Sequence, residues 1–199
     1  LCSRAYRLAK RYSVAPSREL FIELRGLQGV FREAIIGGRI NLNDSRDLYL
    51  GSAITSALQA KVMQDIGQYY AGETAAQVAF FCAEQAGFPP MQSWALCQLS
   101  LMAYRQGELI KASQYANRGG ALSERVSGTN KAWAPALEAR ALAEMGQGES
   151  ARRALHSAES ARGAVVRDEL DQIGGLFEFE EARQVYYAAG TLVNIEDGV

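Results

Sequence analysis

Three glycines recur at a nearly constant interval, and they constrain this chain more than any other feature of its sequence. Gly67 and Gly107 are 40 residues apart, and Gly107 and Gly146 are 39 residues apart. A glycine between two helices supplies the backbone freedom that a tight turn requires, so each glycine predicts a hairpin of two antiparallel helices. Recurrence at about 40 residues in a helical sequence is typical of stacked hairpins.

Small side chains occupy matching positions around these glycines. The residues seven before, five after and twelve after each glycine are, in turn, Ala60, Ser100 and Ala139; Gly72, Ala112 and Ala151; and Ala79, Gly119 and Ala158. Small residues at the first two positions allow the helices of one hairpin to approach closely, and the third lets that hairpin pack on the next. An Ala-rich bundle with chance alignment of small residues is the alternative explanation.

The apolar residues repeat with helical periodicity along almost the whole chain. Leu96, Leu99 and Ala103, for example, fall at positions i, i+3 and i+7, and alternating β-branched runs typical of strands are missing. We therefore expect an all-α fold, an α-solenoid of antiparallel helix hairpins. The nine expected helices span residues 2–13, 17–36, 45–66, 70–86, 92–105, 109–125, 131–145, 149–164 and 180–195.

The expected organisation is a single domain in three parts. Residues 1–43 form an N-terminal helix pair that packs on the array, and residues 44–164 form three hairpins. Residues 165–199 form a loop and a C-terminal capping helix, which corresponds to half a repeat. Both ends of the chain are interpreted as cut points in a longer protein.

The repeat resembles the tetratricopeptide repeat. The closest matches are Leu99-Ser100, Ala103-Tyr104, Gly107-Glu108, Ala112 and Ala116, and then the run Ala139, Leu142, Gly146, Ala151, Leu155 and Ala158. The interval of 39–40 residues exceeds the 34 of that family, and Gly72 stands where alanine is usual. The resemblance implies a right-handed superhelix in which the first helix of each hairpin lines a concave face.

A narrower resemblance covers most of the chain. Ala15 to Leu20, Ser93 to Leu96, Gly174 to Phe179 and Ala182 to Ala188 are similar to the helical sensor region of actinobacterial helix-turn-helix (Xre-type) transcription regulators. In that family a DNA-binding domain precedes the sensor. We find no such domain in this sequence, so the resemblance implies DNA contact only through a part of the parent protein that this chain lacks.

Composition argues against several functional classes. Lys and Arg total 21 against 22 Asp and Glu, so the basic excess of a nucleic-acid binder is absent, and no apolar run is long enough to cross a membrane. The three cysteines are odd in number and widely spaced, so the sequence predicts no disulfide framework. With His156 as its single histidine, it also predicts no metal site. Reduced thiols suggest the cytoplasm. Nucleophile and phosphate-binding motifs are missing, so we expect no enzyme and no cofactor.

The repeat register predicts which side chains face the concave groove. The first helices contribute Ile54, Ala57 and Ala136 as well as the residues we expect to bind: Lys61, Gln64, Asp65, Trp94, Gln98, Leu101, Arg105, Trp133, Arg140 and Glu144, with Cys97 beside them. Aromatic and Arg side chains together suit a recognition surface. Alternatively, the tryptophans fill space between hairpins and the cations pair with Asp65 and Glu144. In the groove interpretation, Trp94→Ala weakens binding and leaves the melting temperature unchanged.

Residues 165–179 are longer than a usual connection between helices. This segment, with Phe177 and Phe179, either folds its aromatics over the end of the groove or seals the array as a hydrophobic cap, and the cap is favoured.

The expected function is therefore non-catalytic recognition of a peptide or protein segment by a sensor module of a cytoplasmic transcription regulator. A homodimerisation scaffold and a small-molecule sensing domain are the alternatives.

Overall fold

The computed structural model describes residues 2–12, 17–37, 42–122 and 125–196, and every regular element in these ranges is helical. The described α-helices are α1 (Cys2–Arg11), α2 (Ser17–Ile36), α3 (Leu42–Asp65), α4 (Tyr69–Gln85), α5 (Pro89–Arg105), α6 (Leu109–Gly120), α7 (Asn130–Glu144), α8 (Gly148–Gly163) and α9 (Glu181–Glu196). Two short 3₁₀ turns, η2 (Asp171–Ile173) and η3 (Gly175–Phe177), lie between α8 and α9. The prediction of an all-α protein is confirmed.

The three repeated glycines do form the hinges between helices. Gly67, Gly107 and Gly146 have φ angles of 75°, 75° and 72°, in the left-handed region that other residues rarely adopt. The amide that follows each glycine donates a hydrogen bond of 2.8 or 2.9 Å to the carbonyl five residues earlier. This is the Schellman geometry that ends a helix and reverses the chain. Gly87, with φ 60°, forms a fourth hinge of the same kind, outside the 40-residue column.

The small residues around the hinges pack as expected. Ala60, Ala112, Ala139 and Ala151 have no exposed surface, and the remaining members of the three columns are also buried. A Cβ atom at Gly72 would lie only 2.8 Å from the Sδ atom of Met102, so this position tolerates glycine alone without a shift of its neighbour. The three columns therefore mark where the helices of one hairpin, or of neighbouring hairpins, approach closely.

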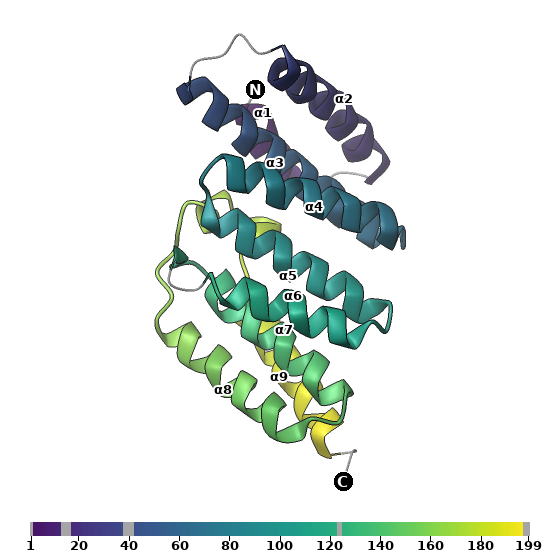
Figure 1. Cartoon of the computed structure of the whole chain (residues 1–199), viewed down its shortest axis with the longest axis vertical. Coiled ribbons are helices and arrows are strands. Elements are labelled where there is room, and N and C mark those ends of the chain that lie inside the picture. The colour runs from purple at the N-terminus through teal and green to yellow at the C-terminus, as the bar shows by residue number, and fades with distance from the viewer. Residues whose placement is uncertain (1, 13–16, 38–41, 123–124, 197–199) are drawn as a thin grey trace.

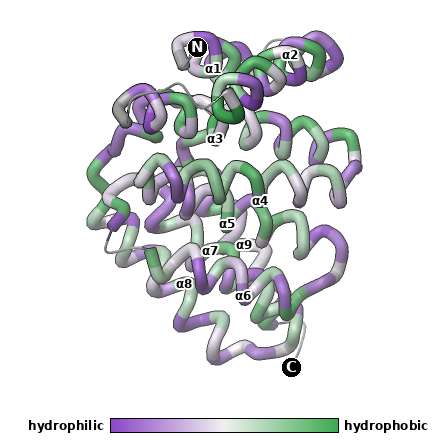
Figure 2. The backbone as a smooth tube through the Cα atoms, turned by 45° about the horizontal axis from the view of Figure 1, so that its top comes forward, coloured by the Kyte–Doolittle hydropathy of each residue, from purple (hydrophilic) through white to green (hydrophobic). Residues whose placement is uncertain are grey.

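Helices α2 to α8 follow one another along the long axis of the molecule, and α1 and α9 lie beside them (Figure 1). Helices α3, α5 and α7 each pack against both the helix before and the helix after them. Helix α1, the η2–η3 segment and helix α9 lie beside these three helices, and we call them the inner layer. Helix α1 contacts α3, the η2–η3 segment contacts α1, and α9 contacts α7. Figure 2 brings the N-terminal end forward and shows α1 and α2 together at that end of the stack. One cluster of buried residues joins α1, α3, α5, α7 and α9.

Two expectations about the helices need correction. Helix α5 begins at Pro89 rather than at residue 92, because proline in the first turn lacks an N–H that would be unpaired there anyway. Helix α6 ends at Gly120 rather than at residue 125. The remaining expected boundaries differ from the observed ones by three residues at most.

Helix α9 does not continue the stack as the first helix of a further hairpin. Helices α5 and α7 pack mainly on the second helix of the preceding hairpin, whereas α9 packs mainly on α7, the first helix of its preceding hairpin, and only slightly on α8. The long connection between α8 and α9 allows this displacement toward the inner side. The expected half repeat is therefore an inner-layer helix.

Candidate functional site

The two tryptophans of the predicted groove lie in the core. Trp94 is fully buried and Trp133 is 3 % exposed, with their ring centroids 6.1 Å apart. Phe177 lies 5.2 Å from Trp94, and Phe179 stacks on Trp133 at 5.8 Å. The expectation that both tryptophans face an open groove is wrong, because the chain's own segment between α8 and α9 covers them.

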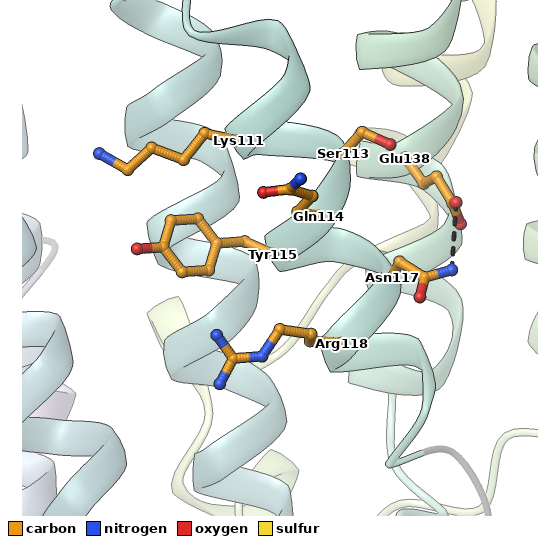
Figure 3. Close-up of a pocket in the computed structure, with 7 residues that line it drawn as sticks. All are labelled: Lys111, Ser113, Gln114, Tyr115, Asn117, Arg118 and Glu138. Carbon is orange, nitrogen blue, oxygen red and sulfur yellow. Dashed lines mark hydrogen bonds between the residues drawn. The ribbon is translucent and has the colours of Figure 1, made fainter.

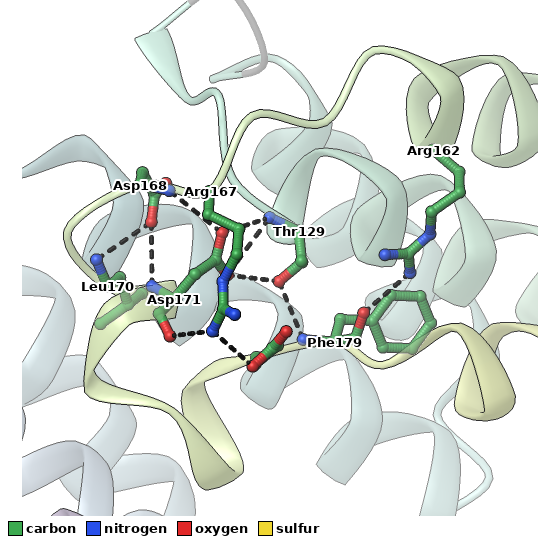
Figure 4. Close-up of polar contacts among 8 residues, drawn as sticks. Thr129, Arg162, Arg167, Asp168, Leu170, Asp171 and Phe179 are labelled. Atoms are coloured by element: carbon green, nitrogen blue, oxygen red, sulfur yellow. Dashed lines mark hydrogen bonds and ion pairs between the residues drawn. The ribbon is translucent and has the colours of Figure 1, made fainter.

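A polar cluster fastens this covering segment to the start of α7 (Figure 4). The buried carboxylate of Asp171 accepts hydrogen bonds from the Thr129 amide at 3.0 Å and from its hydroxyl at 2.6 Å. The Thr129 hydroxyl in turn accepts the Phe179 amide at 2.8 Å. The Asp168 carboxylate accepts the Gly128 amide at 3.1 Å. Negative side chains at a helix N-terminus also interact favourably with the helix dipole.

Two arginines hold the other side of the covering segment. Arg162 donates to the Phe179 carbonyl at 2.8 Å, and Arg167 donates to the Glu178 carboxylate at 2.9 Å. Partial burial raises the pKa of Asp168 and lowers the pKa of Arg162, since desolvation disfavours the charged form of each. The segment is thus an integral cap of the inner face, the favoured one of the two interpretations of residues 165–179.

Three more predicted groove residues are covered. Gln98 donates a 2.6 Å hydrogen bond to the side-chain oxygen of Gln64, and both side chains are almost fully buried between α3 and α5. Leu101 is 8 % exposed. The expectation that these three side chains are free to touch a ligand is therefore also wrong.

The remaining five predicted residues lie at the C-terminal ends of α3, α5 and α7, where the covering segment does not reach. We call this set the open inner surface: Lys61, Asp65, Arg105, Arg140 and Glu144. Lys61 pairs with Asp65, which also accepts the Tyr12 hydroxyl at 2.6 Å. Burial, together with the hydrogen bond to that carboxylate, raises the pKa of Tyr12. The expected pairing of a groove cation with Asp65 is confirmed.

Arg140 is held by aromatic rings rather than by a carboxylate. Its guanidinium lies 4.4 Å from the ring centroid of Tyr104 and 4.3 Å from that of Tyr187. Such cation–π contacts fix the plane of the guanidinium group. Glu144 does not pair with it. That carboxylate accepts the Tyr104 hydroxyl at 2.9 Å and the Asn194 amide at 2.8 Å.

Arg105 is the third cation of this surface, beside Lys61 and Arg140. It is exposed, and within the described ranges it has neither an ion-pair nor a hydrogen-bond partner for its side chain. The open inner surface thus combines an aromatic-clamped arginine with a solvated one, beside the closed Lys61–Asp65 pair. Its chemistry suits carboxylate or carbonyl groups of a bound chain.

A hollow with a volume of about 530 Å³ lies on α6. Figure 3 shows Lys111, Tyr115 and Arg118 on one side of α6, with Asn117 reaching Glu138 on the other. Lys111 is already paired with Glu73 at 3.2 Å and with Glu108 at 2.8 Å. Partial burial raises the pKa of Glu138. Because Lys111 is already paired and Glu138 already accepts a hydrogen bond from Asn117, this hollow is the weaker candidate site.

The free cysteines Cys82 and Cys97 are both buried. Burial raises the pKa of the Cys82 and Cys97 thiols, which keeps both protonated. The described ranges bring together no group of three His, Cys, Asp or Glu side chains suited to hold a metal. None of the described helices has both the length and the apolar character needed to cross a membrane.

No family model, curated protein or solved structure matches the chain in the comparisons.

Proposed function

We propose that the chain is a non-catalytic recognition module that binds a peptide or protein segment on its inner side. The proposed architecture is a right-handed solenoid of the tetratricopeptide type. The four glycine hinges and the buried small-residue columns support it. The resemblance of Gly174 to Phe179 and Ala182 to Ala188 supports the further proposal that the module belongs to a cytoplasmic transcription regulator, which would contact DNA through a separate helix-turn-helix domain.

The observation that carries the binding proposal is the pair of arginines on the open inner surface. Arg140 is oriented by Tyr104 and Tyr187, and Arg105 stands one helix away without a partner in the described part of the chain. An arginine whose plane is fixed before binding loses less conformational freedom on contact with a carboxylate. We therefore assign the ligand as an extended segment that presents acidic side chains or a terminal carboxylate.

The covering segment supports the same mode of recognition. The indole N–H of Trp94 donates to the main-chain carbonyl of Leu176, and Phe177 packs on the same ring. Helix α5 thus holds a 3₁₀ turn of the chain's own covering segment through a main-chain hydrogen bond and an inserted aromatic ring. A ligand on the open inner surface would lie beside that segment.

Selection of displayed random peptides on the immobilised chain tests the proposal. We expect acidic peptides to be enriched, and their affinity, measured by isothermal titration calorimetry, to fall at least about tenfold in Arg105→Glu, equal to about 1.4 kcal/mol. Arg118→Glu is the matched control, because Arg118 is an exposed arginine on α6, outside the open inner surface. Failure to select any peptide, or equal loss in both variants, would refute the proposal.

A further inference from the structure

A hollow of about 470 Å³ lies between α2 and α4. One face of α2 forms most of its lining, and Val78 of α4 and Ser52 of α3 complete it. Helix α3 contacts both neighbours and lies between them in Figure 1. Ser52 and Lys61 are nine residues apart, which places them on opposite sides of α3. The hollow is therefore separate from the open inner surface.

The face of α2 that lines this hollow repeats every seven residues. Three exposed arginines alternate on it with pairs of other residues, in the order Arg18, Phe21-Ile22, Arg25, Gln28-Gly29, Arg32 and Ile35-Ile36. We call this set the heptad face. Ile22 is 62 % exposed and Ile36 is 76 % exposed. A period of seven keeps side chains in line along a neighbouring helix, so this pattern is typical of a surface on which a second helix packs.

The core of the protein depends on a different face of α2. The buried side chains of this helix are Leu20, Leu24, Leu27 and Phe31, which belong to the main core cluster. Gly29, on the heptad face, has no packing role within the described chain, since a Cβ atom there would meet no heavy atom within 4 Å. Glycine inside a helix is destabilising relative to alanine, but it allows another backbone to approach closely.

The arginines of the heptad face have no acidic partner. The residues three and four positions from each of them are never Asp or Glu, so ion pairs within α2 cannot form. Within the described ranges none of the three pairs with another element, whereas Glu23, on another face of α2, pairs with Arg11. The hollow has no acidic side chain among its described lining residues. The three arginines thus form an unbalanced positive row about 21 Å long.

We propose that the heptad face and the adjoining hollow bind a helix of a partner protein, which carries apolar residues and Asp or Glu at seven-residue spacing. The period selects a helical partner, and the arginine row selects an acidic one. Val78, 37 % exposed on α4, offers an apolar contact to the same helix. A second copy is disfavoured as the occupant, because two arginine rows repel each other. This site goes beyond the proposed recognition of an extended segment on the open inner surface.

Selection from a displayed library of helical peptides tests the proposal. Each peptide is about three heptads long, with a fixed apolar row and with either Glu or Lys at every seventh position. We expect Glu in the enriched peptides, and their affinity, measured by fluorescence anisotropy, should fall at least about tenfold in Arg25→Glu. Arg183→Glu is the matched control, since Arg183 is an exposed arginine on α9.

A pair of glycine variants tests close helix contact without a change of charge. Gly29→Gln places a side chain in the hollow, and Gly26→Gln makes the same change three residues earlier, outside the heptad face. A Cβ atom at either position meets no heavy atom within 4 Å, so both variants should fold, and circular-dichroism melting curves verify this. Only Gly29→Gln should weaken peptide binding, again by about tenfold.

Four results would each overturn the proposal. One is the absence of any enriched peptide, or enrichment of Lys at the seventh positions. Another is an equal loss of binding in Gly29→Gln and Gly26→Gln. A loss in Arg105→Glu but not in Arg25→Glu would assign the peptides to the open inner surface instead. Binding to phosphatidylglycerol vesicles, in place of any helical peptide, would assign the heptad face to a membrane surface.

Discussion

The indole nitrogen of Trp94 donates a hydrogen bond of 3.2 Å to the main-chain carbonyl of Leu176, across 82 residues of sequence. This bond joins α5 to the segment that covers the inner face of the array. The tryptophan ring is fully buried, and Phe177 lies against it. Trp94 is therefore a structural contact between the hairpins and the covering segment.

Replacement of Trp94 tests this role. We expect Trp94→Ala to lower the free energy of unfolding by about 3–5 kcal/mol, because it leaves a large cavity under Phe177. Trp94→Phe should cost less, about 1–2 kcal/mol, since it keeps a ring but leaves the Leu176 carbonyl without its donor. Urea denaturation followed by circular dichroism measures both. An unchanged unfolding midpoint in Trp94→Ala would restore the groove interpretation of this residue.

The Thr129 hydroxyl is the central contact of the clamp on the covering segment, since it donates to Asp171 and accepts from Phe179. Thr129→Val keeps the shape of the side chain but leaves a buried carboxylate and a buried amide each short of a partner. We expect a loss of about 2–4 kcal/mol in urea denaturation. Thr129→Ser keeps the hydroxyl and should lose about 1 kcal/mol for one methyl group. Equal losses in the two variants would contradict the hydrogen-bonding role.

The features that could be predicted from the sequence are those that depend on neighbours along the chain. Gly107 forms a hinge because of its own φ angle, and Ala112 is buried because it lies five residues beyond that hinge. Such relations repeat at a fixed interval and are visible without a structure. The side of α7 that faces α9 was predictable in the same way, since Arg140 contacts the ring of Tyr187.

The covering of that side was not predictable, because it depends on where a distant segment lies. Trp94 and Phe177 are both aromatic, but no local pattern indicates that one packs on the other. The position of α9 was missed for a related reason. Its apolar periodicity is equally compatible with packing on α8 or on α7, and the length of the connection before it decides between them.

The positive φ angle of Gly107 predicts that any other residue at this position strains the backbone of the turn. A Cβ atom there would meet no heavy atom within 4 Å, so any cost arises from the φ angle of 75° and not from a clash. Gly107→Val should destabilise the fold by about 1–3 kcal/mol, because a β-branched residue is strained in the left-handed region. Gly107→Asn should cost clearly less, since asparagine tolerates that region. Differential scanning calorimetry compares the two, and equal losses would contradict a conformational origin.

The raised pKa of Glu138, in the hollow on α6, predicts that the stability of the protein depends on pH. Burial raises the pKa of its carboxyl above the ordinary value of 4.5, and the hydrogen bond from Asn117 opposes that shift only in part. A raised pKa means that the folded state binds the proton more tightly than the unfolded state does. The contribution of Glu138 to stability is therefore greatest below pH 4.5 and is lost as the pH rises through the folded pKa.

Glu138→Gln removes that titration while keeping the size of the side chain. We expect the variant to melt at a slightly higher temperature than the wild type at neutral pH, where the wild-type carboxylate bears its desolvation cost. The difference should shrink as the pH falls toward 4.5, because the wild-type carboxyl then becomes neutral as well. Glu159→Gln is the control, since Glu159 is an exposed carboxylate on α8. Melting curves across this pH range test the sign, and a variant that melts below the wild type at neutral pH would show that the ionised form is favoured by its surroundings.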